Sequence, residues 1–276
     1  MLPLNVALVS EVPDVEIPEL NRIGAAIQKQ ITRDFGPIWN IQANLSTFAR
    51  LEDVPVDYWI ATLCYSVPEG SGGHTDTDGR PAAFIEWTDN WSLTASHEIL
   101  EMLADPWGKR LIAGPSVKPD QGRVEYLVEA CDPCQSSECA YTVNGEIVSD
   151  FYTPNFFDPV SAEGVRYSFS GKITAPRQVL RGGYLSWRDE DRHWWQSQWF
   201  KGQEANFVQF GTIVPDSNFR AQIDSITKKA KPTSGKIRRG LQVANSTACE
   251  AAKIRAKRFR ESSSPPPKRR HNNRRT

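Results

Sequence analysis

The sequence contains no run of 18 apolar residues, so a membrane-spanning helix and a membrane partner are not expected. Its first residues, MLPLNVALVSEVPD, lack both a basic stretch and a long apolar core, and therefore predict no secretory signal. Five cysteines are an odd number, which in a chain without an export signal indicates free thiols rather than a disulfide framework. These absences together favour a cytoplasmic protein.

The charge is divided unevenly although the formal net charge is zero. Residues 228–276 hold 16 Lys and Arg against two Glu, about +14, and residues 1–227 hold 17 basic against 31 acidic side chains, about −14. The end of the chain, SSSPPPKRRHNNRRT, is of low complexity and predicts disorder. We therefore expect a folded domain over 1–227 and a largely disordered basic tail over 228–276, which could contact nucleic acid nonspecifically.

The stretch WSLTASHEILEMLADP, residues 91–106, predicts a helix with one narrow polar side. His97, Glu101, Asp105 and Glu98 fall within about 100° of its circumference, and apolar residues fill most of the rest. A helix with so wide an apolar surface packs on several sides. Its polar side then faces either a cleft or a thin strip of solvent, and both readings stay open from spacing alone.

The cleft interpretation gives the polar side a chemistry. Residues at positions i and i+4 lie on one helix face, so His97 and Glu101 can supply a nitrogen and an oxygen ligand to one zinc ion. Glu98 is then placed as a general base, as in the related His-Glu-x-x-His pattern of zinc peptidases. A carboxylate in place of the second histidine also admits another divalent ion.

A catalytic zinc needs at least one more protein ligand. The favoured candidate is Glu129 in the stretch VEACDPC, and Asp132 of the same stretch is the next. Asp105 is either an alternative ligand or a residue that orients one.

Cysteines and a polar loop supply further candidates. Cys131-x-x-Cys134 with Cys139 suggests a structural zinc or redox site, but small buried or loop cysteines are the favoured interpretation because no second CxxC pair follows. The segment SGGHTDTDGRP, residues 71–81 with His74, resembles a calcium loop in its oxygen content. It lacks the glutamate spacing of an EF-hand, so a polar turn is favoured.

Two tyrosines close to the candidate ligands in sequence could stabilise an oxyanion. Tyr141 and Tyr152 lie on or beside a predicted hairpin. Packing is the ordinary role of hairpin tyrosines and remains the favoured interpretation.

Hydrophobic periodicity predicts the order β-α-β-β-β-α for the first hundred residues. The helices are expected at 17–35, ended by Gly36-Pro37, and at 91–106; the strands are expected at 5–10, 38–48, 57–67 and 82–87. In zincin peptidases a small sheet of this kind precedes the helix that bears the metal motif, which supports the cleft interpretation by analogy.

The second half of the chain is expected to be rich in β-structure. Residues 111–122 predict a loop, 123–132 a strand in preference to a helix, and Asn144-Gly145 a type I′ hairpin between 140–143 and 146–152. Residues 165–200 carry four tryptophans that we expect to pack in the core, and 219–227 predict a short closing helix.

The stretches SHEILEMLADP, VEACDPC and VSDFYTPNFF resemble a group of uncharacterised bacterial and phage proteins over most of residues 1–225. A looser likeness, through His-Glu-x-x-Glu followed by Asp-Pro and a later Glu-x-x-Asp, extends to secreted plant and fungal proteins of the exordium type and to zincin-like folds. The resemblance implies at most a metal site at His97 and Glu101.

We therefore predict an α+β, zincin-like domain with a small mixed sheet and an active-site helix, followed by a β-rich region and the tail. The leading function is a metal-dependent hydrolase, and within that class a zinc metallopeptidase acting on a peptide or protein substrate is favoured. The alternatives are a non-catalytic binding protein with the same fold and a phage- or DNA-associated module that acts through its tail.

Overall fold

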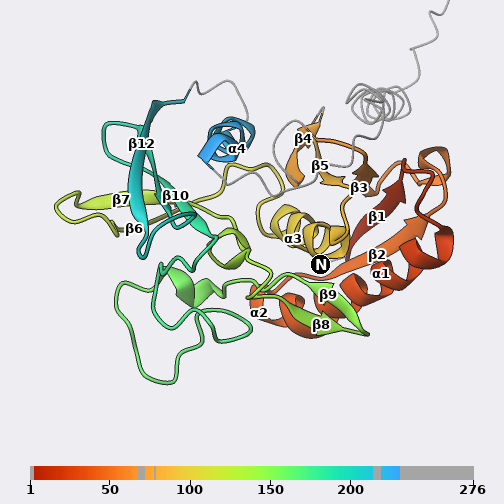
Figure 1. The fold of residues 1–276 in the computed structure, drawn as a ribbon, viewed down its shortest axis with the longest axis horizontal. Coiled ribbons are helices and arrows are strands. Elements are labelled where there is room, and N and C mark those ends of the chain that lie inside the picture. Colours follow the sequence, from red (N-terminus) through yellow and green to blue (C-terminus); the bar gives the residue numbers. More distant parts are fainter. Residues whose placement is uncertain (1–2, 68–71, 78, 214–218, 231–276) are drawn as a thin grey trace, which may run out of the picture.

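The computed structural model describes residues 3–67, 72–77, 79–213 and 219–230 (Figure 1). The part of the predicted basic tail from residue 231 onward, with its expected contact with nucleic acid, lies outside the described residues. Among the helices in the described ranges, none has both the length and the apolar character that a membrane crossing requires. The architecture is α+β, as predicted.

The first sheet is mixed and has the strand order β2-β1-β3-β5-β4. Pairing is parallel from β2 to β5, and only the edge strand β4 runs antiparallel to its neighbour β5. The strands are β1 (Leu4–Ser10), β2 (Ala43–Phe48), β3 (Trp59–Cys64), β4 (Gly72–Thr77) and β5 (Arg80–Glu86). Two helices pack against this sheet, α1 (Ile17–Gln30) on β2 and β1, and α3 (Trp91–Ala104) on β5 and β4.

The loop predicted at 71–81 is wrong, because residues 72–77 form strand β4. Its glycine, threonine and aspartate content is typical of a turn, but backbone pairing with β5 from Gly72↔Ile85 to Thr77↔Arg80 overrides this local preference. His74, paired with Ala83, is therefore held on a strand and not in a polar turn.

The first helix does not end at Gly36-Pro37 as predicted. It continues through a π-helical turn (Ile31–Phe35) into α2 (Gly36–Trp39) and ends at Asn40, which has a left-handed backbone with φ 54°. In the wider turn, the Gly36 N–H bonds to the Ile31 carbonyl, five residues back, and Pro37 falls in the first turn of α2, where a missing N–H is tolerated.

The second sheet is antiparallel and has the order β12-β11-β10-β7-β6. Its strands are β6 (Leu111–Pro115), β7 (Arg123–Leu127), β10 (Tyr184–Arg188), β11 (His193–Gln198) and β12 (Asn206–Thr212). The strand predicted in 123–132 is confirmed over its first half. The predicted loop at 111–122 is wrong over 111–115, where β6 pairs with β7.

The predicted hairpin is confirmed as β8 (Tyr141–Val143) and β9 (Glu146–Val148). Asn144 and Gly145 both have positive φ, 51° and 86°, as a type I′ turn requires. The hairpin packs against α1 and α3 on the side away from β4. Short 3₁₀ turns at Leu51–Asp53, Asp132–Cys134 and Pro154–Phe157 complete the connections.

Helix α4 (Phe219–Ala230) joins the two sheets. Its Ile223 belongs to a hydrophobic cluster with Leu127 of β7 and Trp194 of β11, and α4 also contacts β4. In Figure 1 the first sheet lies on the right, the second on the left, and α3 between them. One large hydrophobic cluster runs from the first sheet through α3 to Trp187 of β10, so both sheets share a core around α3.

A substitution at Gly183 tests the close contact between the start of β10 and the loop after β7. A Cβ at Gly183 would lie 2.4 Å from the Pro133 carbonyl oxygen and 2.7 Å from that of Asp132. Because both are backbone atoms, we expect Gly183→Ala to lower the free energy of unfolding by about 1–3 kcal/mol in urea denaturation. Gly114→Ala is the control, since its nearest heavy atom lies 3.4 Å away, and should change stability by about 0.5 kcal/mol or less. Equal stabilities of the two variants would contradict the close approach.

Candidate metal centre

The polar side of α3 faces the interior and not solvent. Glu101 is 0% exposed and His97 is 8% exposed, and Glu98 is also buried. The alternative of a solvated polar strip is therefore excluded for these residues. Buried ionisable groups require partners of opposite charge, hydrogen bonds or a cation, because desolvation of an isolated charge costs several kcal/mol.

The loop that follows β7 is hydrogen-bonded to Glu101 of α3. Glu101 Oε1 accepts hydrogen bonds from the backbone N–H groups of Cys131 (3.0 Å) and Asp132 (3.2 Å). Tyr152 also holds this loop, since its hydroxyl oxygen accepts a hydrogen bond from the Glu129 N–H (2.9 Å). The sequence stretch VEACDPC is thus brought against the helix.

His97 lies between two carboxylates. Its Nε2 is 3.2 Å from Glu101 Oε2 and 3.3 Å from Asp132 Oδ1, with Glu98 Oε1 at 3.9 Å. We expected Glu129 to be the third group beside His97 and Glu101. Among the described residues, Asp132 is the third group beside His97 and Glu101, and Glu129 instead contacts the Arg220 guanidinium.

The charges shift the pKa values of the pair on α3 in opposite directions. Burial alone lowers the pKa of His97, but the Glu101 carboxylate and hydrogen bonds with Asp132 and Glu101 outweigh it and hold the pKa well above its usual value. Burial raises the pKa of Glu101, yet His97 and Arg220 together hold it well below its usual value. Glu101 is therefore a carboxylate, and this centre attracts positive charge.

Arg220 of α4 places its guanidinium among these carboxylates. The sequence did not indicate this residue. Its Nη2 is 2.8 Å from Glu101 Oε2 and 3.8 Å from Asp132 Oδ2, its Nη1 contacts Glu129 Oε2, and its Nε is 2.7 Å from Asp224 Oδ2. Arg220 is 2% exposed, so these contacts are screened little by water. An internal cation thus balances part of the acidic charge.

Asp105 does not bring its carboxylate into the contacts with His97. It lies just beyond the end of α3, and its Oδ2 accepts a hydrogen bond from the Arg110 N–H (2.7 Å). Its backbone carbonyl lies 3.1 Å from His74 Nε2. Asp105 therefore orients the His74 ring through its main chain.

The cysteines of residues 131–139 and Tyr141 were further candidates from the sequence. Burial raises the pKa values of Cys131 and Cys134 well above the usual value, so both are protonated thiols. Cys134 and Cys139 belong to no group of metal-capable side chains in the described part of the chain. The Tyr141 hydroxyl donates a hydrogen bond to Asp34 Oδ2 and accepts one from Gln30 Nε2.

Three sets of side chains in the described ranges could hold a metal ion, each with ligand atoms within 4.8 Å of one another. They are His97, Glu101 and Cys131; His74, Glu98 and Glu101; and Glu101, Glu129 and Asp132. Glu101 belongs to all three. Nitrogen and carboxylate donors suit zinc and other first-row divalent ions. Buried atoms of these sets, among them His74 Nδ1 and Glu98 Oε2, have no hydrogen-bond partner among the described residues.

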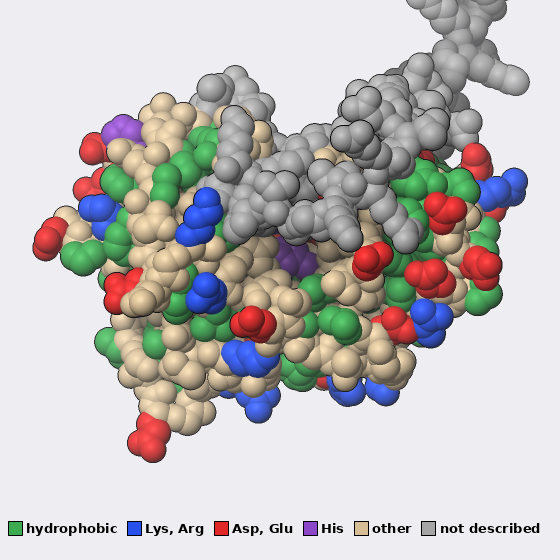
Figure 2. All heavy atoms as spheres, in the orientation of Figure 1, with side chains coloured by type: hydrophobic (Ala, Val, Ile, Leu, Met, Phe, Trp, Pro, Cys, Tyr) green, Lys and Arg blue, Asp and Glu red, His purple; other side chains and the backbone are tan. Residues whose placement is uncertain are grey.

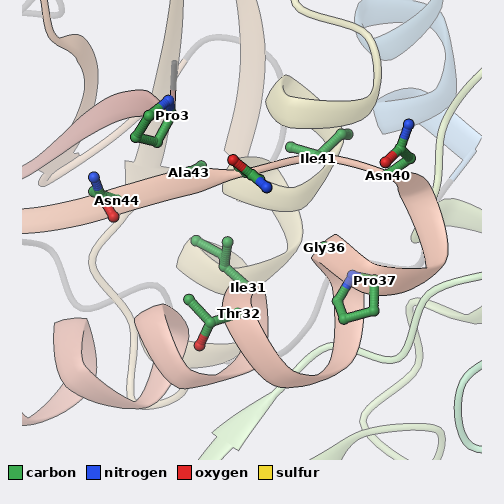
Figure 3. A pocket seen from close by; sticks show the side chains of 10 residues that line it. Pro3, Ile31, Thr32, Gly36, Pro37, Asn40, Ile41, Ala43 and Asn44 are labelled. Carbon is green, nitrogen blue, oxygen red and sulfur yellow. The ribbon is translucent and has the colours of Figure 1, made fainter. Parts of the chain in front are cut away.

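A pocket of about 450 Å³ lies elsewhere, between the π-helical turn, α2 and the start of β2 (Figure 3). None of the described residues that line it has an ionisable side chain. Acid–base or metal chemistry is therefore not expected there. On the face shown in Figure 2, acidic and basic side chains are interspersed, and a histidine side chain is visible near the middle.

Removing the internal cation tests how strongly the carboxylates depend on it. Arg220→Gln leaves Glu101 and Glu129 without the guanidinium, and we expect the free energy of unfolding of the chelator-treated protein to fall by about 3–5 kcal/mol. The control Arg181→Gln replaces an exposed arginine and should cost about 0.5 kcal/mol or less. Denaturant unfolding measures both. A loss below about 1 kcal/mol for Arg220→Gln would show that the ion pairs contribute little.

Comparison with known proteins adds no family to this description. No protein-family model, curated protein or solved structure matches the chain. The resemblance to bacterial and phage proteins and to zincins stays a prediction.

Proposed function

We propose that the protein is a metal-dependent hydrolase whose divalent ion, zinc in the simplest case, is held by His97, Glu101 and Asp132. The observation that carries the proposal is the position of His97 Nε2, 3.2 Å from Glu101 Oε2 and 3.3 Å from Asp132 Oδ1. Two ligands of one tetrahedral zinc, with bonds of about 2.0–2.1 Å, lie about 3.3 Å apart. Both pairs have this separation. The proposed ligands combine members of two of the metal-capable sets, His97 and Glu101 from the first and Glu101 and Asp132 from the third.

Glu98 is the acid–base residue in this proposal. It neighbours His97 on α3, is buried, and has Oε1 3.9 Å from His97 Nε2. A divalent ion in such a site supplies Lewis acidity and makes water more acidic. Glu98 would then accept a proton from water and deliver it to the leaving group, while His97, Glu101 and Asp132 would hold the ion.

The fold supports a peptide as the substrate class. β4 is the edge strand of the first sheet, runs antiparallel to β5 and packs against α3. An extended peptide can add to such an edge through backbone hydrogen bonds. A small mixed sheet followed by the motif-bearing helix is also the order that zincin-like folds have, which supports the zincin-like part of the prediction by analogy.

A second candidate function rests on Arg220. If its guanidinium is the permanent counter-charge of Glu101, Glu129 and Asp224, the protein is a non-catalytic binding protein that needs no metal. Such a protein would contain no zinc after purification in zinc-supplemented medium, and metal addition would not change its thermal unfolding.

Metal content tests the proposed ligands. We expect His97→Ala and Asp132→Asn to remove zinc that the wild-type protein retains through dialysis, because each loses one of three donors. His193→Ala is the matched control, since His193 lies on β11 beside Asp189 and outside the three metal-capable sets. Mass spectrometric metal analysis gives the result. Equal zinc in the wild type and His97→Ala would refute the assignment of His97.

Glu98→Gln tests the acid–base role. The amide cannot accept the proton, so hydrolysis of a mixture of quenched fluorescent peptides should fall about 10²- to 10⁴-fold. Zinc held through His97 should remain, which separates loss of chemistry from loss of the ion. Full hydrolysis by Glu98→Gln would place the base on another residue.

A further inference from the structure

His74 belongs to the same buried centre, although the proposed hydrolase does not use it. It lies on edge strand β4 and is 1% exposed. Its Nδ1 is 3.8 Å from Glu101 Oε2 and 3.9 Å from Glu98 Oε2. A histidine from β4 thus faces the two glutamates of α3 from the side of the first sheet.

The hydrogen bond of the other ring nitrogen sets the tautomer. His74 Nε2 is 3.1 Å from the Asp105 carbonyl oxygen, which can only accept, so Nε2 carries the proton. In the neutral ring Nδ1 then presents a lone pair. This is the arrangement of most metal-ligating histidines, which donate the second ring N–H to a carbonyl or a carboxylate and so hold the ring in one orientation.

The atoms that meet at this point are all electron-rich. Neither His74 Nδ1 nor Glu98 Oε2 has a hydrogen-bond partner in the described part of the chain, and both are buried. With Glu101 they form a set whose donor atoms lie within 4.8 Å of one another. Arg220 and His97 contact Glu101 Oε2, but His74 Nδ1 and Glu98 Oε2 have no such partner, and electron-rich donors in a dry site repel one another unless a cation lies between them.

The formal charge leaves room for more than one divalent cation. Four carboxylates, those of Glu101, Glu129, Asp132 and Asp224, contact the guanidinium of Arg220, and the Glu98 carboxylate lies beside His74 and His97. With neutral histidines, these five carboxylates and Arg220 carry a formal charge of −4. One divalent ion at His97 would leave a formal charge of −2. A second would balance the centre.

β4 can approach Glu98 this closely because residue 72 is glycine. A Cβ at Gly72 would lie 2.6 Å from Glu98 Oε1 and 2.7 Å from Glu98 Cγ. The backbone of β4 therefore packs directly on the glutamate side chain, and His74, two residues along the strand, points to the same side.

The geometry points to a second divalent-cation site, formed by His74 Nδ1, Glu98 Oε2 and Glu101 Oε2, beside the ion at His97 and sharing Glu101 with it. The inference rests on the proposed function for that neighbouring ion. Two ions about 3.5–4 Å apart that share protein ligands are typical of hydrolases that act on phosphoesters and on the ends of peptides. The second ion would hold Glu98 by one oxygen and leave the other directed toward His97.

Zinc stoichiometry tests the second site. Protein stripped with a chelator, reloaded with zinc and dialysed should hold two equivalents in the wild type and in His193→Ala, one in His74→Ala, one in His97→Ala and none in the double variant. Mass spectrometric metal analysis measures the zinc, and far-ultraviolet circular dichroism shows that each variant is folded.

The outcomes separate this inference from the proposed function. One equivalent in the wild type that His74→Ala retains overturns the second site and leaves the ion at His97. One equivalent that His74→Ala loses and His97→Ala retains supports the site at His74 and overturns the His97 assignment. No zinc in any protein overturns both.

Gly72→Ala keeps every ligand and provides a second variant if His74→Ala does not fold. The added methyl group would displace Glu98, so we expect the affinity for the second zinc equivalent to fall by about tenfold or more in a competitive chelator titration, as when ligand-orienting contacts are lost. The first equivalent should be unchanged. Two unchanged affinities would overturn the role of Glu98 in the second site.

Discussion

The buried carboxylate of Glu101 is the constraint on which the rest of the centre depends. It is inaccessible to solvent, and each of its oxygens has several partners: Oε1 accepts two backbone N–H groups of the loop after β7, and Oε2 lies against His97 and Arg220. A buried carboxylate without such partners would cost several kcal/mol. Satisfying this one charge therefore brings helix α3, the 131–132 loop and helix α4 together.

The same groups serve folding and cation binding, so the two are linked. Carboxylates that need counter-charge for stability are also the donors that a divalent ion requires, and any ion that binds the folded state alone stabilises it. Arg220 provides part of that charge from within the chain, on a helix that packs on the second sheet and contacts β4. A bound divalent ion, the Arg220 guanidinium and a protonated His97 can each supply positive charge to the same buried carboxylates.

Most of the regular fold was predictable because its signals are local. The 3.6-residue period marks α3, and Asn144-Gly145 requires the positive φ values that the hairpin shows. β4 and β6 were missed, since their sequences favour turns and their strands exist through pairing with β5 and β7. The helix that continues through Gly36-Pro37 was missed because a π-helical turn accommodates the proline.

For the site, the sequence alone determined the spacing of His97, Glu98 and Glu101, which places the three on one side of a helix. It also indicated that a carboxylate of the VEACDPC stretch returns to that helix. Tertiary structure decided that Asp132 and not Glu129 lies at His97, and that His74 and Arg220 join the centre. Those choices depend on strand pairing and helix packing between distant segments, and no local pattern encodes which side chains such packing brings within 4 Å.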